Sequence, residues 1–433
     1  MFNPDPYIYA LQKVEMVQVY GKVLQVVGLV VEVQVQGVQV SELCRIMVGE
    51  KEFVFAEVVG FKEDRVLLMP LGPLIGIKPG NRVYATGRPI EVPVGPQMLG
   101  RVLDGLGNPM DEKGEYPIEE RYVIDRDPPN AIHRPRIEKV LETGVKAIDA
   151  TLTLGRGQRV GIFAGSGVGK STLMGMLARN CTAEVNVIAL IGERGREVKE
   201  FIEDSLGEEG LKKSVVICAT SDQAPVVRLK GAMVGTAVAE YFRDQGKDVL
   251  FMMDSVTRFA MAQREIGLAT GEPPTTKGYT PSVFAMLPRL MERAGTSDKG
   301  SITAIYTVLV EGGDMDEPIA DAARGILDGH FVLSRDLAAK NHYPCLDVGH
   351  SVSRLMSGIC SDEHKSAAGQ MREVLARYKE AEDLINIGAY VKGSNPKIDY
   401  AIEKIDQVND LLKQATNENI PFDQTVDDMV HMF

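Results

Sequence analysis

A glycine-rich segment near the middle of the chain constrains the fold more than any other stretch. It reads Ala164-Gly165-Ser166-Gly167-Val168-Gly169-Lys170-Ser171-Thr172. A short apolar run at 159–163 precedes it, and a helical pattern at 173–180 follows it. A strand, a glycine loop with Lys-Ser, and a helix together form the arrangement of the phosphate-binding P-loop. The sequence therefore predicts a P-loop fold, although Ala164 stands where the strict pattern has glycine.

The residues of the predicted loop have distinct tasks toward a phosphate chain. Glycines let successive backbone N–H groups turn toward the phosphates, and the helix N-terminus adds partial positive charge. Lys170 is suited to reach the β- and γ-phosphates, and the Ser171 hydroxyl is suited to ligate Mg²⁺. A glycine-rich turn that only resembles a P-loop agrees less well with the Lys-Ser-Thr run and its flanking elements. We expect the nucleotide to be held by Gly165, Ser166, Gly167, Val168, Gly169, Lys170, Ser171 and Thr172.

Composition argues against several classes of protein. The 433 residues are enough for two to four domains. A net charge of −12 argues against nucleic acid as the main partner, while leaving room for a local basic groove. The five cysteines are scattered without a C-x-x-C pair, which indicates a reducing compartment and no disulfide framework. No apolar run approaches the length of a membrane span and no signal peptide opens the chain, so we expect a cytoplasmic protein.

The first part of the chain has the pattern of a small β-barrel. Residues 31–35 alternate apolar and polar side chains, and further strands are expected at 53–59 and 65–69. Closely spaced glycines between short strands predict a closed barrel over 17–86. Because the barrel lacks the aromatic interleaving of nucleic-acid modules, a structural or assembly role is favoured. The segment 1–16 is open between a short helix, a docking segment and a frayed terminus.

The middle of the chain has the rhythm of an α/β domain. A Pro- and Gly-rich connector at 88–155 is expected to pass between domains. Strands expected at 185–190, 214–220, 248–254 and 302–310 then alternate with helices at 230–244 and 259–267, and a further helix closes at 201–206. This order predicts a mainly parallel sheet with helices on both faces and with ligands at the carboxyl ends of the strands.

The last part of the chain is expected to be helical. Apolar residues at 370–384 and 398–412 recur at helical spacing, and Val426 and Met429 belong to a final helix. The predicted division of the chain is therefore a segment at 1–16, a barrel at 17–86, an ATPase-type core at 87–356 and a helical domain at 357–433.

Two acidic residues follow buried strands in the predicted core. Asp254 ends the apolar run 249–253 in the Walker B form and should hold Mg²⁺, directly or through water. Glu193 lies in the run Gly192–Glu197 after the strand at 185–190 and is our candidate base for the water that attacks the γ-phosphate. Its neighbour Arg194 is a candidate for binding the negative charge of the γ-phosphate. For Glu193 and Arg194, the alternative interpretation is a solvated charged turn without a catalytic role.

Two further residues lie near the end of the predicted core. Arg354 belongs to the run 351–356, which we place beyond the last core strand. It would be poorly placed for its own P-loop if that edge forms a subunit contact, and an arginine supplied in trans is worth ~10³–10⁵ in rate in other P-loop enzymes. From residue type alone, a surface arginine in a salt bridge is the default. Tyr343 is suited to stack on adenine, and a core tyrosine is the alternative.

Taken together, these segments resemble the family of flagellar type III protein export ATPases. Relatives of this family are the catalytic subunits of rotary ATP synthases and the virulence secretion ATPases. The resemblance covers nearly the whole chain. The Pro-Pro-Thr-Thr-Lys-Gly-Tyr run at 273–279 and the run 338–344 look flagellar. The segments that carry the resemblance are 163–172, 192–197, 254–260, 271–279, 281–284, 287–290, 292–295, 343–344 and 351–354.

The resemblance implies a fold, an assembly and a chemistry. The fold is an N-terminal barrel, a RecA-like core and a C-terminal helical domain, and the assembly is a homohexamer with sites at its subunit interfaces. The chemistry is hydrolysis of ATP to ADP with Mg²⁺. The implied roles are the P-loop lysine Lys170, the base Glu193, the Walker B Asp254, the Arg354 finger from a neighbour and the adenine-facing Tyr343.

The resemblance also implies a biological role. Hydrolysis would energise unloading and export of flagellar proteins at a membrane-embedded gate. The implied partners are a regulatory stator-like protein, a central stalk-like protein, the export gate and chaperone–substrate complexes, without nucleic acid. The implied location is the cytoplasm, peripheral at the inner face of the cell membrane.

Four alternatives stay open at this point. The first is a virulence (injectisome) secretion ATPase, and the second is a rotary synthase subunit, which requires a second, related chain. The third is an RNA-translocating hexamer, which predicts RNA-stimulated hydrolysis. The last is a non-catalytic nucleotide-binding scaffold, and Glu193 argues against it because a scaffold has no use for the base.

Overall fold

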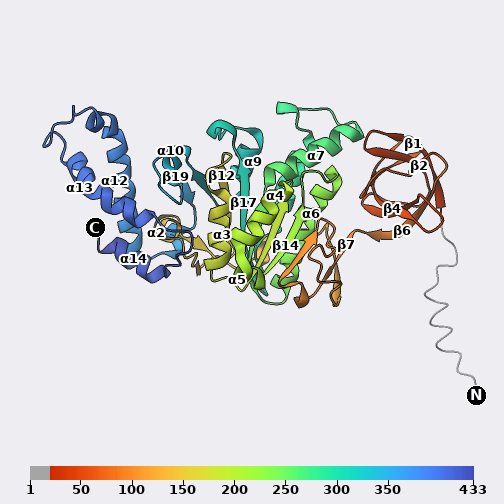
Figure 1. Cartoon of the computed structure of the whole chain (residues 1–433), viewed down its shortest axis with the longest axis horizontal. Helices are drawn as coiled ribbons and strands as arrows, with labels where there is room; N and C mark the ends of the chain where they lie inside the picture. Colours follow the sequence, from red (N-terminus) through yellow and green to blue (C-terminus); the bar gives the residue numbers. More distant parts are fainter. Residues whose placement is uncertain (1–19) are drawn as a thin grey trace, which may run out of the picture.

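The computed structural model describes residues 20–433, which form three parts in a row (Figure 1). A β-barrel and a set of C-terminal helices lie at opposite ends of a central α/β core. The predicted fold class, a small β-barrel followed by a mainly parallel P-loop core and a helical domain, is confirmed. The predicted segment 1–16 and the first three residues of the predicted barrel lie outside the described residues. We keep the predicted boundaries after 86 and 356 as our proposal for the division of the chain.

The barrel closes in the strand order β1-β2-β5-β4-β3-β6. Its strands are antiparallel, and alternate side chains such as Val31 and Val33 fill the interior with other small apolar residues. The period-2 pattern of the sequence therefore reflects an inside and an outside face. The strands are β1 (Tyr20–Val27), β2 (Val30–Gln34), β3 (Glu42–Met47), β4 (Phe53–Lys62), β5 (Arg65–Pro70) and β6 (Arg82–Pro89).

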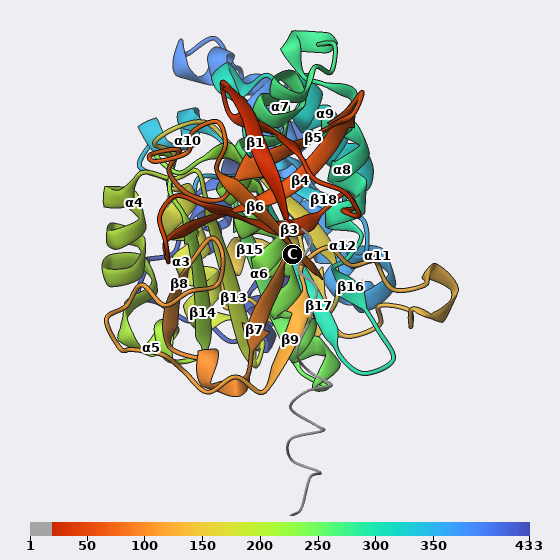
Figure 2. The ribbon, with the colours of Figure 1, turned by 90° about the vertical axis from the view of Figure 1, so that its right-hand side faces the viewer.

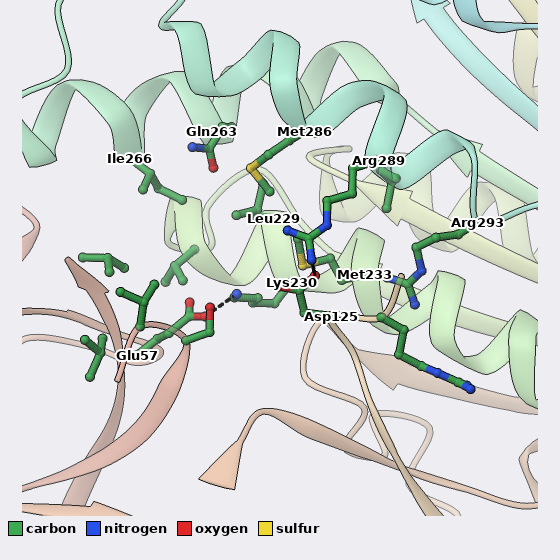
Figure 3. A pocket seen from close by; sticks show the side chains of 17 residues that line it. Glu57, Asp125, Leu229, Lys230, Met233, Gln263, Ile266, Met286, Arg289 and Arg293 are labelled. Atoms are coloured by element: carbon green, nitrogen blue, oxygen red, sulfur yellow. Dashed lines mark hydrogen bonds and ion pairs between the residues drawn. The ribbon is translucent and has the colours of Figure 1, made fainter. Parts of the chain in front are cut away.

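A buried ion pair fastens the barrel to the core (Figure 3). Lys230 from helix α6 (Pro225–Asp244) places its Nζ 2.5 Å from Oε1 of Glu57 on β4, and both side chains are buried. A cavity of about 230 Å³ lies beside the pair, with Met233, Ile266 and Arg289 among the residues that line it. The P-loop contributes no residue to this cavity, which is a feature of the joint between the two domains.

The core sheet has the strand order β19-β18-β12-β17-β15-β13-β14-β8. Its pairs are parallel except for β19, which runs antiparallel to β18, and the short β16, which pairs antiparallel with β17. The strands are β8 (Arg101–Asp104), β12 (Arg159–Ala164), β13 (Val185–Ile191), β14 (Ser214–Ala219), β15 (Asp248–Asp254), β16 (Gly295–Thr296), β17 (Ser301–Leu309), β18 (Gly329–Leu333) and β19 (Leu346–Ser353).

Alternate residues of the core strands belong to two separate hydrophobic cores. Val187 and Ala189 of β13 pack with helices α6, α7 (Val256–Thr270), α8 (Pro281–Met291) and α9 (Pro318–Ile326). Ile188 and Leu190 pack on the other face with α2 (Lys146–Thr151), α3 (Lys170–Asn180) and α4 (Gly195–Glu200). Because both faces are covered, the strands read as continuous apolar runs, as expected for a parallel sheet.

The C-terminal helices pack on the second of these cores. They are α11 (Met356–Ile359), α12 (Asp362–Asn386), α13 (Pro396–Leu412) and α14 (Phe422–Val430). The predicted stripe on α13 is buried at Ala401, Ile405, Val408 and Leu412. Over the range 20–433, no helix has the length and apolar character that crossing a membrane requires.

Short elements complete the chain between these parts. Figure 2, seen from the barrel, shows α4 and α5 beside the edge of the sheet that β14 and β8 form. The remaining elements are β7 (Glu91–Val94), η1 (Pro96–Met98), β9 (Glu120–Val123), η2 (Ala131–His133), β10 (Val140–Leu141), β11 (Leu154–Gly155), η3 (Phe201–Leu206), α5 (Gly207–Lys212), η4 (Thr276–Gly278), η5 (Glu311–Gly313) and α10 (Arg335–Ala339).

Two predictions about the core need correction. The segment 88–155 is more than a connector, because β8 joins the core sheet beside β14 and β7 pairs with β9. The run 351–356 does not lie beyond the last core strand, because β18 and β19 follow β17 and residues 351–353 belong to β19. These strands are short or carry polar residues at a sheet edge, so their sequences lack the long apolar runs of the central strands.

The ion pair at the domain joint yields a stability prediction. Replacing Lys230 by Ala leaves the Glu57 carboxylate buried without its cation, which we expect to cost about 3–5 kcal/mol of unfolding free energy. Urea unfolding of Lys230→Ala beside the parent chain measures this loss. Lys247→Ala is the matched control, because Lys247 forms a half-exposed pair with Glu184 at 2.7 Å and should cost about 1 kcal/mol or less. Equal losses in the two variants would contradict the role of the buried pair.

Candidate nucleotide site at the carboxyl edge of the sheet

The predicted P-loop connects a central strand to a helix. Strand β12 ends at Ala164, and α3 begins at Lys170. Gly167 and Gly169 have φ of 78° and 84°, a conformation that favours glycine, and a Cβ at either position would meet nothing within 4 Å. Val168 is buried, whereas the hydroxyl-bearing Ser171 is exposed. A loop with open space along its backbone and a helix N-terminus behind it fits a phosphate chain.

The structure brings together three site residues from separate segments of the chain. Lys170 follows β12, Glu193 follows β13, and Asp254 ends β15, so all three lie at the carboxyl edge of the sheet. The Nζ of Lys170 is 2.5 Å from Oδ1 of Asp254 and 3.5 Å from Oε1 of Glu193. This is the convergence that parallel α/β sheets favour.

The charges of this cluster alter the proton affinities within it. Burial raises the pKa of Glu193 to about 7, aided by repulsion from Asp254 and opposed by Lys170. Burial alone would lower the pKa of Lys170, but the carboxylates of Asp254 and Glu193 outweigh burial and raise it. A carboxylate with a pKa near neutral beside a cationic lysine is suited to accept a proton at physiological pH.

Hydrogen bonds from neighbouring segments fix the Asp254 carboxylate and the backbone of Glu193. Thr307 of β17 donates its hydroxyl hydrogen to Oδ1 of Asp254 at 2.6 Å. The backbone N–H of Ser221 donates to the carbonyl of Glu193 at 3.0 Å. The sequence analysis missed Thr307, because Ser301, Thr303 and Tyr306 of the same strand also carry hydroxyls and nothing in the sequence distinguishes Thr307 from them.

Arg258 is a further site residue that the analysis of the sequence did not single out. Gly192 has a φ of 73°, and a Cβ there would lie 2.8 Å from Cβ of Arg258, so the arginine stem packs against the residue before Glu193. Within residues 20–433, the buried Nε of Arg258 has no hydrogen-bond partner. A buried, unpaired guanidinium nitrogen beside the Glu193 segment fits an anionic ligand group. The feature of the sequence that could have indicated Arg258 is its position four residues after Asp254.

Arg335 is a second missed cation beside the P-loop. It begins α10, directly after strand β18 and Ser334, and β18 is the parallel neighbour of β12. A Cβ on Gly165 would lie 3.0 Å from Nη2 of Arg335, so the guanidinium packs against the loop backbone. No ion pair of Arg335 is found in the described part of the chain.

Arg194 lies at the rim of the site. Its side chain is 76% exposed, and its Nη1 is 3.5 Å from Oε1 of Glu197 on α4. In the structure the guanidinium of Arg194 therefore forms a surface salt bridge with Glu197. A role at the γ-phosphate stays a prediction for Arg194.

Arg354 lies at the opposite edge of the sheet from its own P-loop. It follows β19, and its N–H donates to the carbonyl of Asp328 at 3.0 Å, beside the beginning of β18. Strand β18 runs parallel to β12, so Arg354 is level with the start of β12, whereas the P-loop follows its end. Six residues of strand separate the two positions by roughly 17 Å. The exposed Arg354 is therefore out of reach of its own phosphate site. Its action on the nucleotide of a neighbouring subunit stays a prediction.

Tyr343 lies on the loop between α10 and β19. Its side chain is 44% exposed, which excludes the interpretation of Tyr343 as a core tyrosine. Its carbonyl accepts the N–H of Gln414 at 2.9 Å. Its exposed ring and its place after α10, which starts beside the P-loop, are compatible with contact to a nucleotide base.

Comparison with known proteins finds three family models along the chain. Residues 23–87 match the beta-barrel domain of the ATP synthase alpha/beta family, and residues 144–353 match the nucleotide-binding domain of the same family. Residues 360–431 match the T3SS EscN ATPase C-terminal domain.

Similar proteins cover nearly the whole chain. A flagellum-specific ATP synthase of Bacillus subtilis is 54% identical over 94% of this chain and 93% of its own length. A type 3 secretion system ATPase of Xanthomonas euvesicatoria is 54% identical over 94% of this chain and 92% of its own length. The solved structure of the assembled ATPase EscN from the enteropathogenic E. coli type III secretion system has a TM-score of 0.90 at 43% identity. It covers 95% of this chain and 99% of that one.

The contact between Gly192 and Arg258 can be tested by substitution. Gly192→Ala places a Cβ against the arginine stem in a left-handed backbone conformation, which we expect to cost about 1–3 kcal/mol and to displace Arg258. Thermal unfolding measures the stability loss. Gly195→Ala is the control, because a Cβ at Gly195 meets nothing within 4 Å and should be nearly neutral or slightly stabilising at the start of α4. An unchanged melting temperature for Gly192→Ala would contradict the contact.

Proposed function

The chain belongs to the family of flagellum-specific ATP synthases and type 3 secretion system ATPases, a branch of the ATP synthase alpha/beta family, and on this premise we propose how it acts. It hydrolyses ATP in a Mg²⁺-dependent reaction at the subunit interfaces of a homohexameric ring. Hydrolysis energises the unloading and export of flagellar proteins through a type III secretion apparatus.

The observation that carries the proposal is the convergence of Lys170, Glu193 and Asp254. A phosphate-binding lysine within 3.5 Å of two carboxylates joins a cation for the substrate to a base for the attacking water. A non-catalytic scaffold would have no use for the base Glu193. The pKa of about 7 for Glu193 is the value that a base working at neutral pH requires.

The substrate is bound at the P-loop. The backbone N–H groups of the loop and the Nζ of Lys170 hold the β- and γ-phosphates of ATP, and the exposed ring of Tyr343 stacks on adenine. Ser171 and Asp254 would hold Mg²⁺, which neutralises phosphate charge when bound. The hydroxyl of Thr307 fixes the Asp254 carboxylate for that task.

Hydrolysis follows from the position of Glu193. Its carboxylate accepts a proton from water as the water oxygen bonds to the γ-phosphorus and the bond from that phosphorus to the β–γ bridging oxygen breaks. ADP and phosphate are the products. Arg258, packed against Gly192, and an Arg354 supplied by the neighbouring subunit stabilise the negative charge that spreads over the transferred group.

Assembly is part of the proposed mechanism. Because Arg354 is far from its own P-loop, a single chain does not complete the site. In a ring, the surface that carries Arg354 would face the nucleotide site of the neighbouring subunit. Structures of EscN are described as an assembled ATPase and as a complex with its central stalk EscO. By analogy, we propose that this chain forms a homohexamer and contacts a central stalk-like protein.

The flagellar role rests on the sequence run at 273–279. Identity does not separate the two roles, because a flagellar and a secretion relative are both 54% identical to the chain. We propose the flagellar role, with a stator-like regulator, an export gate and chaperone–substrate complexes as further partners. We place the protein in the cytoplasm, peripheral at the inner face of the cell membrane.

A virulence secretion ATPase is the second candidate, supported by the same relatives. A rotary synthase subunit is less well supported, because residues 360–431 match the C-terminal domain of a secretion ATPase. An RNA-translocating hexamer is disfavoured by the net charge of −12.

Replacing the base separates binding from turnover. Glu193→Gln removes the proton acceptor and keeps the shape, so we expect ATP binding to persist while kcat falls by about 10²–10⁴-fold. Nucleotide binding by calorimetry and phosphate release measure the two effects. Glu200→Gln on the exposed face of α4 is the control and should keep full activity. Retention of near-full hydrolysis by Glu193→Gln would show that another group is the base.

Glu193 also sets the expected pH dependence of ATP hydrolysis. Only the ionised form of Glu193 accepts a proton, so kcat/KM should fall about tenfold per pH unit below a pKa near 7 and level off above it. The residual activity of Glu193→Gln should lack this acid limb. An acid limb that is unchanged in the variant would assign the titration to a different group.

Mixing experiments test the contribution of Arg354 in trans. Lys170→Ala and Arg354→Ala subunits should each be inactive, and mixed rings should regain activity where an intact Lys170 faces an intact Arg354. Random mixing in equal amounts makes about a quarter of the interfaces complete. Phosphate release is measured after native mass spectrometry has shown mixed rings. Mixed rings without rescue would contradict action in trans.

A further inference from the structure

The loop after α13 contacts several parts of the core at once. We call residues 413–419 the junction loop. Arg179 and Asn180, at the end of α3, donate side-chain N–H groups to carbonyls of the junction loop at 2.5 and 2.8 Å. The N–H of Gln414 donates to the carbonyl of Tyr343 at 2.9 Å. The junction loop therefore links the C-terminal helices to the P-loop helix and to the loop that carries Tyr343.

The buried side chain of Gln414 fixes the junction loop to the core. Its Nε2 donates to the carbonyls of Gly144 and Glu418 at 2.8 and 3.1 Å, and its Oε1 accepts the N–H of Lys146 at 2.8 Å. Both hydrogens and the oxygen of the amide are therefore in use. Glutamate has the same length but cannot donate to the two carbonyls.

The segment that Gln414 contacts is itself held firmly. The fully buried carboxylate of Asp149 on α2 accepts the N–H groups of Thr143 and Gly144 and the hydroxyl of Thr143, at 2.8 to 3.0 Å. This turn enters the helix in front of the P-loop strand. Gln414 therefore connects a hydrogen-bonded turn of the core on one side to the junction loop on the other.

The segment from Arg335 to Tyr343 connects the two ends of the nucleotide site. Arg335 packs against Gly165 at one end, and the carbonyl of Tyr343 is bonded to Gln414 at the other. Helix α10 spans most of the distance between them. A shift of the junction loop would therefore move the Tyr343 end, while the Arg335 end stays against the P-loop.

We propose that Gln414 is a positioning residue for the adenine end of the site. Its side chain fixes the junction loop to residues 144–146, so that the backbone of the loop holds Tyr343 where the base binds. The inference rests on the proposed function, in which Tyr343 faces adenine. It makes the affinity for the base dependent on the placement of the C-terminal helices, without a change at Lys170, Glu193 or Asp254.

The chain offers a direct reporter for this proposal because it contains no tryptophan. Tyr343→Trp introduces a single indole at the proposed base site, and ADP should quench its fluorescence in the full-length chain. Titration with ADP gives the affinity for a nucleotide. Competition with inorganic tripolyphosphate, which has no base, gives the affinity of the phosphate site alone.

Gln414→Glu and Gln414→Ala are then made in the Tyr343→Trp chain and in the parent chain. We expect the affinity for ADP to fall about tenfold, as when hydrogen bonds that order a binding group are lost, while the affinity for tripolyphosphate stays within about twofold. In the parent chain, KM for ATP should rise with kcat changed less than about threefold. Gln407→Glu, on the exposed face of α13, is the matched control and should change neither affinity.

Three results would overturn the proposal. If ADP and tripolyphosphate lose affinity equally, Gln414 supports the phosphate site or the fold and not the base. If neither loses affinity in a variant that melts near the parent temperature, the junction loop does not position Tyr343. If calorimetry shows that ADP binds the Tyr343→Trp chain without quenching the indole, Tyr343 is not at the base, and this part of the proposed function fails with the inference. A lower affinity for ADP with an unchanged affinity for tripolyphosphate supports the proposal.

Discussion

The site depends on one electrostatic arrangement, a lysine held between two carboxylates at the carboxyl edge of a buried sheet. Lys170 lies 2.5 Å from Asp254 and 3.5 Å from Glu193, and each of the three residues follows or ends a different strand. The strand order β12-β17-β15-β13 brings the ends of these strands together. Because neither face of the sheet is open to water, these charges interact more strongly than they would at a surface. The two hydrophobic cores therefore serve the chemistry by fixing strand positions and by excluding solvent.

Those parts of the fold that depend on local pattern could be predicted from the sequence. The strand at 248–254 was placed at its observed bounds, because an apolar run that ends in an acid has few other interpretations. The barrel and the stripe on α13 were equally visible, since inside and outside residues alternate with the period of a strand or a helix. Lys170, Glu193 and Asp254 were proposed as site residues for a similar reason, because each follows or ends a strong strand signal.

The remaining parts depend on contacts between distant segments, which leave weak traces in a sequence. Strand β8 has four residues, and it is a strand because β14 offers it an edge. Thr307 and Arg258 have a role only once β17 and α7 lie beside the carboxylates. Gln414 bonds Gly144 across 270 residues of chain, and nothing near position 414 distinguishes this glutamine from the exposed Gln407 of the same region. Polar residues buried by tertiary structure are therefore the ones that sequence reasoning misses.

The position of Arg354 connects the architecture with regulation. In a parallel sheet the carboxyl edge collects the groups that bind phosphate, and β19, because it runs antiparallel, returns the chain to the opposite edge. An arginine placed there cannot act on the nucleotide of its own chain, whatever its rotamer, since the strands are longer than its side chain. In the proposed mechanism, a free subunit therefore binds ATP with the groups at one edge and lacks the cation for cleavage. Turnover then requires a neighbouring subunit. Hydrolysis is therefore restricted to the assembled ring, and free subunits do not consume ATP.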